Sequence, residues 1–263
     1  MTLRRCLPLL VASLCALLVA CGGSSHSVTR ARLLTAIDTT RAIGSAHVAE
    51  ALTLVSPQGN AEATVTGDEN FAANAGTTIV KEGSVEAHVA FRNGTAWLTI
   101  NAPQFTRLLP SGKTWVQAPT AQLETLGVFH PLSDGFALLD ALRGVKTIKQ
   151  SGSNAATFTF SLAQAMAQTP ASRRAALQSA IHANGDIKSQ TGSVALTSSG
   201  AVRSESLRIV GAGSNAGIQL QNTLAISDIG EHVSPTPPPA AQVASLSSLP
   251  ALQSALRSSG SSS

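Results

Sequence analysis

The sequence predicts an α+β protein in which helices cover one face of an antiparallel sheet. Three observations support this fold class. Short stretches repeat apolar residues at helical spacing, whereas longer ones alternate apolar and polar residues with the period of a strand. Turn signals such as Asn93-Gly94 separate the alternating stretches. A sheet with one apolar face needs a cover, which amphipathic helices can supply.

The first element is an export signal over residues 1–20. Arg4 and Arg5 make its start positive, and residues 6–20 are apolar or small apart from one serine. That run has the length of a signal-peptide core and is short for a permanent membrane span. We therefore expect residues 1–20 to be removed after export.

The signal ends in Leu18-Val19-Ala20-Cys21, which resembles the lipobox of bacterial lipoproteins. The resemblance implies that Cys21 becomes the first mature residue and carries lipid such as palmitate, because a thiolate is readily alkylated. Residues 21–28 would form this lipidated cysteine and a flexible tether. The predicted location is therefore extracytoplasmic, on the outer face of the bacterial cytoplasmic membrane. An ordinary cleavable signal that happens to contain a cysteine is the alternative.

Composition excludes several classes of protein. The only other cysteines, Cys6 and Cys15, lie inside the signal, so the mature chain has no disulfide framework. The net charge is +4, and Arg4 and Arg5 account for two of these charges. No basic cluster with interleaved aromatic residues is present, so we expect no nucleic-acid partner.

The folded domain is predicted over residues 29–233. It opens with a helix over residues 29–43, with Thr29 as its N-cap. Two later helices are expected, over residues 134–143 with Asp134 as cap, and from Pro170 to about residue 183. The predicted strands are residues 46–55, 61–67, 85–92, 95–100, 113–117, 145–150, 155–160, 186–197, 201–210 and 216–228.

Residues 234–263 are predicted to be a disordered tail rich in proline and serine. Prolines interrupt regular structure at its start, and the chain closes on a serine-rich stretch. A weak helix near residues 242–256 is the one regular element expected there.

Four stretches resemble the LppX/LprAFG family of actinobacterial lipoproteins, relatives of the LolA/LolB fold. They are GSAHVAEALTL (44–54), SGKTWVQ (111–117), GDIKSQTGSVALTSSGAVRSESLRIVG (185–211) and HVSPTPPPA (232–240). The resemblance implies a curved, unclosed half-barrel with helices on its concave face. It also implies an apolar cavity between sheet and helices that takes an acyl lipid or glycolipid. A transporter of the cell envelope would be a further partner, which the sequence does not name.

The predicted cavity lining combines that implied fold with the direction of the apolar side chains. The expected residues on the sheet and on the middle helix are Val89, Phe91, Phe158, Phe160, Leu220, Leu224, Leu138 and Leu142. The pattern leaves open whether this space is hollow or packed. The alternative function is a structural or interaction lipoprotein of the cell envelope, with a filled core and no ligand.

Enzyme motifs give no support to catalysis. The six histidines form no H-E-x-x-H or other close pair, and neither G-x-S-x-G nor S-x-x-K occurs. Asp134 and Asp140 are the nearest grouping of carboxylates in the middle of the chain, and Asp134 is explained by a helix cap. We therefore expect no enzyme, no metal and no cofactor.

Overall fold

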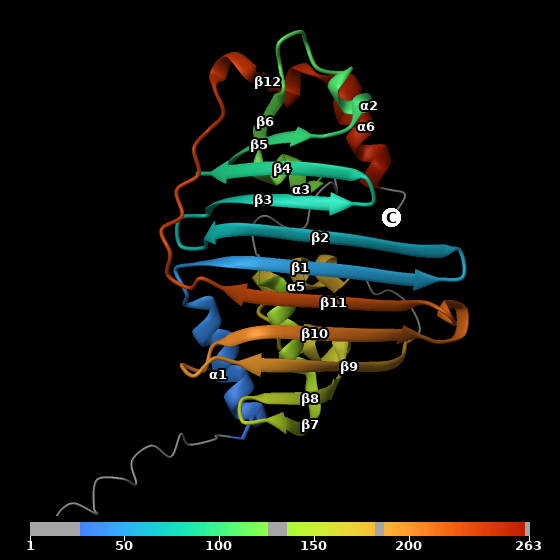
Figure 1. Ribbon diagram of the computed structural model, residues 1–263. Helices are drawn as coiled ribbons and strands as arrows, with labels where there is room; N and C mark the ends of the chain where they lie inside the picture. The colour runs from blue at the N-terminus through green and yellow to red at the C-terminus, as the bar shows by residue number, and fades with distance from the viewer. Residues whose placement is uncertain (1–26, 126–135, 182–186, 261–263) are drawn as a thin grey trace, which may run out of the picture.

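The computed structural model (Figure 1) describes residues 27–125, 136–181 and 187–260. Cys21, the signal and most of the tether lie outside these residues, as does Asp134. Within them the chain forms one twelve-stranded sheet, in the order β12-β6-β5-β4-β3-β2-β1-β11-β10-β9-β8-β7. The strands are β1 Ser45–Ser56, β2 Gly59–Asn70, β3 Ala75–Glu82, β4 Val85–Arg92, β5 Thr95–Ile100, β6 Trp115–Pro119, β7 Val145–Gly152, β8 Ala155–Phe160, β9 Ile187–Leu196, β10 Val202–Gly211, β11 Gln219–Ser227 and β12 Val243–Ser245.

Two meanders make up this sheet. Strands β1 to β6 run outward from the middle in consecutive antiparallel pairs. The chain then crosses to the far edge, and β7 to β11 return until β11 pairs with β1. The sheet is not closed, because β12 and β7 remain its two edges. The predicted fold class, an α+β protein with an unclosed antiparallel sheet, is therefore confirmed.

The turn between β4 and β5 shows how the sequence sets the register. Asn93 and Gly94 both have positive φ, at 53° and 74°. Such turns match the right-handed twist of the flanking strands, and asparagine and glycine are the residues that tolerate the conformation. As a result Arg92 pairs with Thr95, and the alternating side chains of both strands meet on the same faces.

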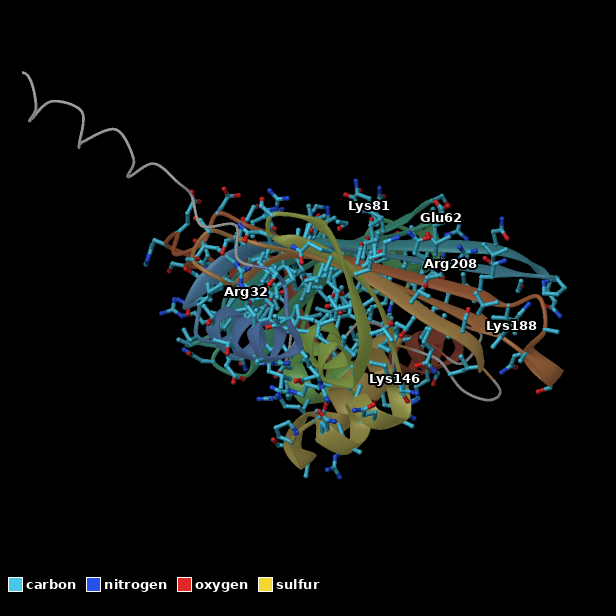
Figure 2. The ribbon with its side chains drawn as sticks, turned by 90° about the horizontal axis from the view of Figure 1, so that it is seen from below. Arg32, Glu62, Lys81, Lys146, Lys188 and Arg208 are labelled. Atoms are coloured by element: carbon cyan, nitrogen blue, oxygen red, sulfur yellow. The ribbon has the colours of Figure 1, made fainter. Side chains whose placement is uncertain are left out.

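The helices lie on one side of the sheet (Figures 1 and 2). Helix α1 begins after Thr29, whose side chain accepts a hydrogen bond from the Arg32 backbone N–H at 3.2 Å, as an N-cap does. The α-helices are α1 Arg30–Arg41, α2 Pro103–Thr106, α3 Thr120–Thr125, α4 Leu162–Gln168, α5 Ala171–Ile181 and α6 Pro250–Gly260. The 3₁₀ segments are η1 Ala137–Gly144, η2 Gly213–Asn215, η3 Ala240–Gln242 and η4 Leu246–Ser248.

Two separate apolar cores form between the sheet and these helices. The first core joins α1, η1, α4 and α5 to β8–β11 and the start of β1, and Leu33, Leu142 and Leu177 are fully buried in it. The second core joins α2, α3, η4 and α6 to β4–β6. Each core therefore covers one end of the sheet.

The structure corrects the prediction for residues 234–263. Instead of a disordered tail, the described part of this segment forms β12, which pairs in parallel with β6, and α6. Leu246, Leu252 and Leu256 are at most 4% exposed in the second core. The prediction of disorder was based on the proline and serine content and overlooked these leucines. Their burial offsets the entropy lost when the segment becomes ordered.

The middle helix also differs from the prediction. Residues 137–144 form a 3₁₀ segment, and nearly all of its side chains are buried rather than one stripe of them. A Cβ on Gly144 would lie 2.3 Å from the Ser161 carbonyl oxygen, so the backbones pack closely at its end.

Helix α4 was not predicted, although Ser161 caps it. Strand β3, over Ala75–Glu82, was not predicted either.

Candidate functional site

The eight predicted lining residues face the helix-covered side but do not surround one space. Leu220 is the most exposed of them, at 7%. Val89 and Phe91 belong to the second core. The first core holds the others, which are Leu138, Leu142, Phe158, Phe160, Leu220 and Leu224. At these positions the side chains pack as protein core, and their role as ligand contacts stays a prediction.

Between the two cores, the inner face of the central strands is less well covered. Leu52 and Leu54 on β1, Val65 on β2 and Val80 on β3 are half-buried and apolar, and Glu50 lies among them. We call these five residues the middle strip. Glu50, Val65 and Val80 stand in one cross-strand row. The strip is therefore a mainly apolar surface flanked by helices at both ends of the sheet.

The row that contains Glu50 continues into the first core and reaches a second acidic residue. Glu50 pairs with Leu224, and Leu224 pairs with Glu205 on β10. Glu205 shares the inner face of β10 with Leu207 and Ile209 and is 3% exposed. Two strand spacings of about 4.8 Å place the backbones of Glu50 and Glu205 about 10 Å apart.

Glu205 has an unusual environment for a carboxyl group. Within the described part of the chain, neither of its carboxylate oxygens has a hydrogen-bond partner. Burial raises the pKa of Glu205 well above its usual value, and the charges of Asp140 and Glu50 raise it further. A buried polar group without a partner costs about 1–3 kcal/mol, so we expect Glu205 to lower the stability of the domain.

A second buried acid, Asp140 on η1, is fully paired. Its carboxylate accepts from Arg143 Nε at 2.7 Å, Arg41 Nη2 at 2.9 Å and Arg173 Nε at 3.0 Å. These arginines come from η1, α1 and α5, so one carboxylate links three elements of the first core. The arrangement is a structural ion network. Of the two carboxylates grouped in the sequence, Asp134 and Asp140, the structure describes only Asp140, and this network explains its burial.

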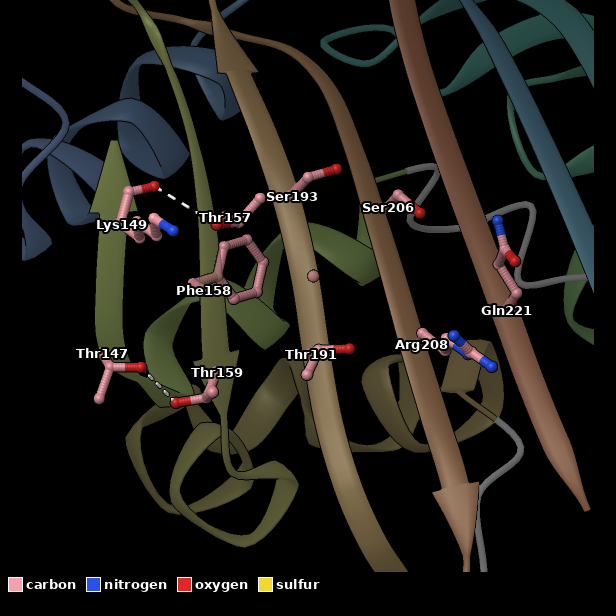
Figure 3. A pocket seen from close by; sticks show the side chains of 11 residues that line it. Thr147, Lys149, Thr157, Phe158, Thr159, Thr191, Ser193, Ser206, Arg208 and Gln221 are labelled. Atoms are coloured by element: carbon pink, nitrogen blue, oxygen red, sulfur yellow. Dashed lines mark hydrogen bonds between the residues drawn. The ribbon is translucent and has the colours of Figure 1, made fainter. Parts of the chain in front are cut away.

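The opposite, helix-free face carries a hollow that the sequence did not indicate. It has a volume of about 450 Å³ and lies over β7–β11. Figure 3 shows hydroxyl groups across its floor, with Lys149 and Arg208 among them. Thr147 and Thr159 pair across β7 and β8 with their hydroxyl oxygens 2.6 Å apart. The hollow is shallow and open, and Phe158, one of the predicted lining residues, also lines it.

A smaller hollow of about 220 Å³ lies where the chain after β11 passes the end of β1 and β2. His47 Nδ1 lies 2.7 Å from Asp68 Oδ1 at its rim, and both side chains are substantially exposed. No group of three or more His, Cys, Asp or Glu side chains in the described residues is placed to hold a metal ion. In the same residues, no helix is long and apolar enough to cross a membrane.

Comparisons with known proteins give a likeness of fold. No family model matches the chain, and no curated protein sequence does. The solved structure of the Mycobacterium tuberculosis lipoprotein LppX is 18% identical, with 78% of this chain and 96% of that one covered and a TM-score of 0.40. The solved structure of LprF from Mycobacterium bovis is 14% identical, with 81% of this chain and 100% of that one covered and a TM-score of 0.44.

Both of these solved structures are of mycobacterial lipoproteins. The likeness concerns the course of the chain, and it assigns neither a ligand nor a binding residue to this protein.

Proposed function

We propose that this protein is a membrane-anchored lipoprotein that binds a hydrophobic ligand, an acyl lipid or glycolipid, against the middle strip. The observation that supports the proposal is the half-buried apolar surface of Leu52, Leu54, Val65 and Val80 between two separately packed cores. A single filled core would bury these side chains as fully as their neighbours. In this proposal the protein is a carrier or sensor and not an enzyme.

Burial of apolar surface would drive such binding. Each Å² of apolar area removed from water contributes about 25 cal/mol, and an acyl chain presents only such area along its length. The side chains of the strip other than Glu50 have no polar groups. Binding of the chain portion of the ligand should therefore depend weakly on salt.

Anchoring through Cys21 is the second part of the proposal. One acyl chain holds a protein marginally and two hold it stably, because each buried CH₂ contributes about 0.8 kcal/mol. The test replaces Cys21 with serine and fractionates the cells. We expect the Cys21→Ser protein to leave the membrane pellet, and full retention there would contradict the anchor.

Ligand binding is tested by uptake of a fluorescent fatty-acyl probe, together with native mass spectrometry of protein extracted gently from cells. We expect wild type to take up the probe and Leu52→Trp to block it by filling the strip. Thr53→Trp is the matched control, because Thr53 is the next residue on β1 and lies on the helix-free face. It should bind the probe like wild type.

The alternative function is a structural or interaction lipoprotein of the cell envelope without a ligand. It predicts that wild type takes up no probe and carries no lipid after extraction. It also predicts that Leu52→Trp overpacks the site and destabilises the domain by about 1–3 kcal/mol. Measuring melting temperature beside uptake separates the two functions.

A further inference from the structure

We propose that Glu205 is the polar recognition point of the hydrophobic site and hydrogen-bonds a hydroxyl group on the ligand. The ligand would then be a long-chain alcohol or a hydroxylated acyl chain. This inference rests on the proposed function and adds the chemistry of the ligand's polar group.

The position of Glu205 carries the inference. It is 3% exposed, points to the helix-covered face, and has no hydrogen-bond partner on either oxygen within the described residues. Its neighbours in the cross-strand row, Leu224 and Val194, are apolar and buried. The described residues leave both oxygens of Glu205 open to a partner, and the row leads from Glu205 across Leu224 to Glu50 in the middle strip.

The charge of the surroundings selects the kind of partner. Burial and the nearby negative charges of Asp140 and Glu50 favour the protonated form of Glu205. A protonated carboxyl group offers one O–H donor and an acceptor oxygen. A hydroxyl group matches both, because it accepts and donates at once. An ether can only accept, and a carboxylate ligand would meet the two negative charges.

The distance also fits a ligand that enters from the strip. The backbones of Glu50 and Glu205 are about 10 Å apart across two strand spacings. A ligand chain lying on the half-buried Leu52 and Val65 would present a hydroxyl group to Glu205 by displacing the side chains that cover Leu224, which is 1% exposed. The apolar part stays on the strip while the hydroxyl group reaches the buried acid.

The test measures binding of four probes with the same oleyl chain: oleyl alcohol, its methyl ether, oleylamine and oleic acid. The full mature protein is used. We expect wild type to bind the alcohol about tenfold more tightly than the ether, the factor of one net hydrogen bond of about 1.4 kcal/mol. Oleic acid should bind less tightly than the alcohol.

Two variants complete the experiment. Glu205→Leu should bind alcohol and ether equally, because it keeps the apolar site and removes the polar group. Glu205→Gln should keep the preference for the alcohol, because an amide also donates and accepts. Melting curves establish that each variant is folded. If Glu205→Leu does not fold, the wild-type probe series and the Glu205→Gln variant still test whether Glu205 binds a hydroxyl group.

The outcomes separate this inference from the proposed function. Equal affinity of wild type for alcohol and ether would overturn the role of Glu205 and leave the hydrophobic site standing. Tightest binding of oleylamine would overturn the hydroxyl assignment in favour of a cationic group. Failure of wild type to bind any of the four probes would overturn the proposed function and this inference together.

Discussion

The two ends of the sheet are covered in different ways. At the end formed by β7–β11, the helical segments α1, η1 and α5 are joined by a buried ion network around Asp140. At the end formed by β4–β6, the cover is completed by α6, which lies more than a hundred residues further along the chain, and its contacts are leucine side chains. Burial of apolar surface thus holds both ends, and the first end has directional ion pairs in addition. The middle strip lies between the two cores and is only half-buried, with Leu52 and Leu54 at the edge of the first core and Val80 at the edge of the second.

The largest expected effect concerns the second end. Ending the chain at Val233 removes Leu246, Leu252 and Leu256 from the second core. A buried Leu→Ala substitution costs about 2–5 kcal/mol, so losing three leucines should cost about 6 kcal/mol or more and lower the melting temperature by over about 10 °C. A chain ended after residue 260 is the control, and it should melt like the full chain. A shift of only a few degrees on ending at Val233 would mean that α6 does not hold this end.

The next effect concerns the first end. Asp140→Asn keeps the shape of the side chain but leaves three arginines without their carboxylate, which we expect to cost about 3 kcal/mol in urea unfolding. Hydrogen exchange should rise in α1 and α5 and stay unchanged in α6. Asp38→Asn is the matched control, because Asp38 is largely exposed and 3.3 Å from Arg143, and it should cost less than about 1 kcal/mol. Equal losses of stability in the two variants would contradict the view that the Asp140 ion network holds α1, η1 and α5 together.

A smaller effect separates Glu205 from Asp140 within the same end. The pKa of Glu205 is raised in the folded state, so the folded protein keeps a proton that the unfolded chain releases above about pH 4.5. Stability should therefore fall as the pH rises from about 4.5 toward the folded pKa, by at most about 1.4 kcal/mol per unit.

Glu205→Gln should remove this slope, and Glu205→Leu should raise stability at neutral pH by about 1–3 kcal/mol. Urea unfolding of wild type and both variants at several values between pH 5 and 8 measures these changes. A Glu205→Leu protein less stable than wild type would show that the carboxyl group has a partner in the fold.

The smallest expected effect concerns the start of α1. Thr29→Ala removes the side-chain cap and should cost about 1 kcal/mol, whereas Thr29→Ser should be close to neutral. Thermal unfolding of the two variants side by side measures the difference. Helix α2 at the other end begins after Ala102, which makes no side-chain cap, so Ala102→Val should change melting through packing alone.

Local patterns predicted most of the sheet. Alternation and the Asn93-Gly94 turn gave β4 and β5 within a residue of their bounds, because hairpins are encoded over a few neighbouring residues. The arrangement of two cores was not predictable in this way. It depends on pairings between residues far apart in the sequence, such as Val243 with Trp115 in the β12–β6 pair, and the local alternation of residues does not predict these.

The candidate site was predicted only in part. The apolar inner face was recognised, but the lining residues, predicted from the implied fold and the direction of their side chains, proved to be packed in two cores. Glu205 was missed although the sequence carries a signal for it. It stands at the inward position of a strand whose next inward residues are Leu207 and Ile209, and a charge there breaks the alternation.

The two edges of the sheet bear on how the protein behaves when many copies are crowded together. An exposed regular edge strand can add a strand from another molecule, which is a common route to aggregation. Here one edge is β12, only three residues long. The other is β7, which carries exposed lysines at 146 and 149 and has two register irregularities against β8. Neither edge offers a second copy a long, straight row of backbone groups, so the molecules should stay dispersed at high concentration.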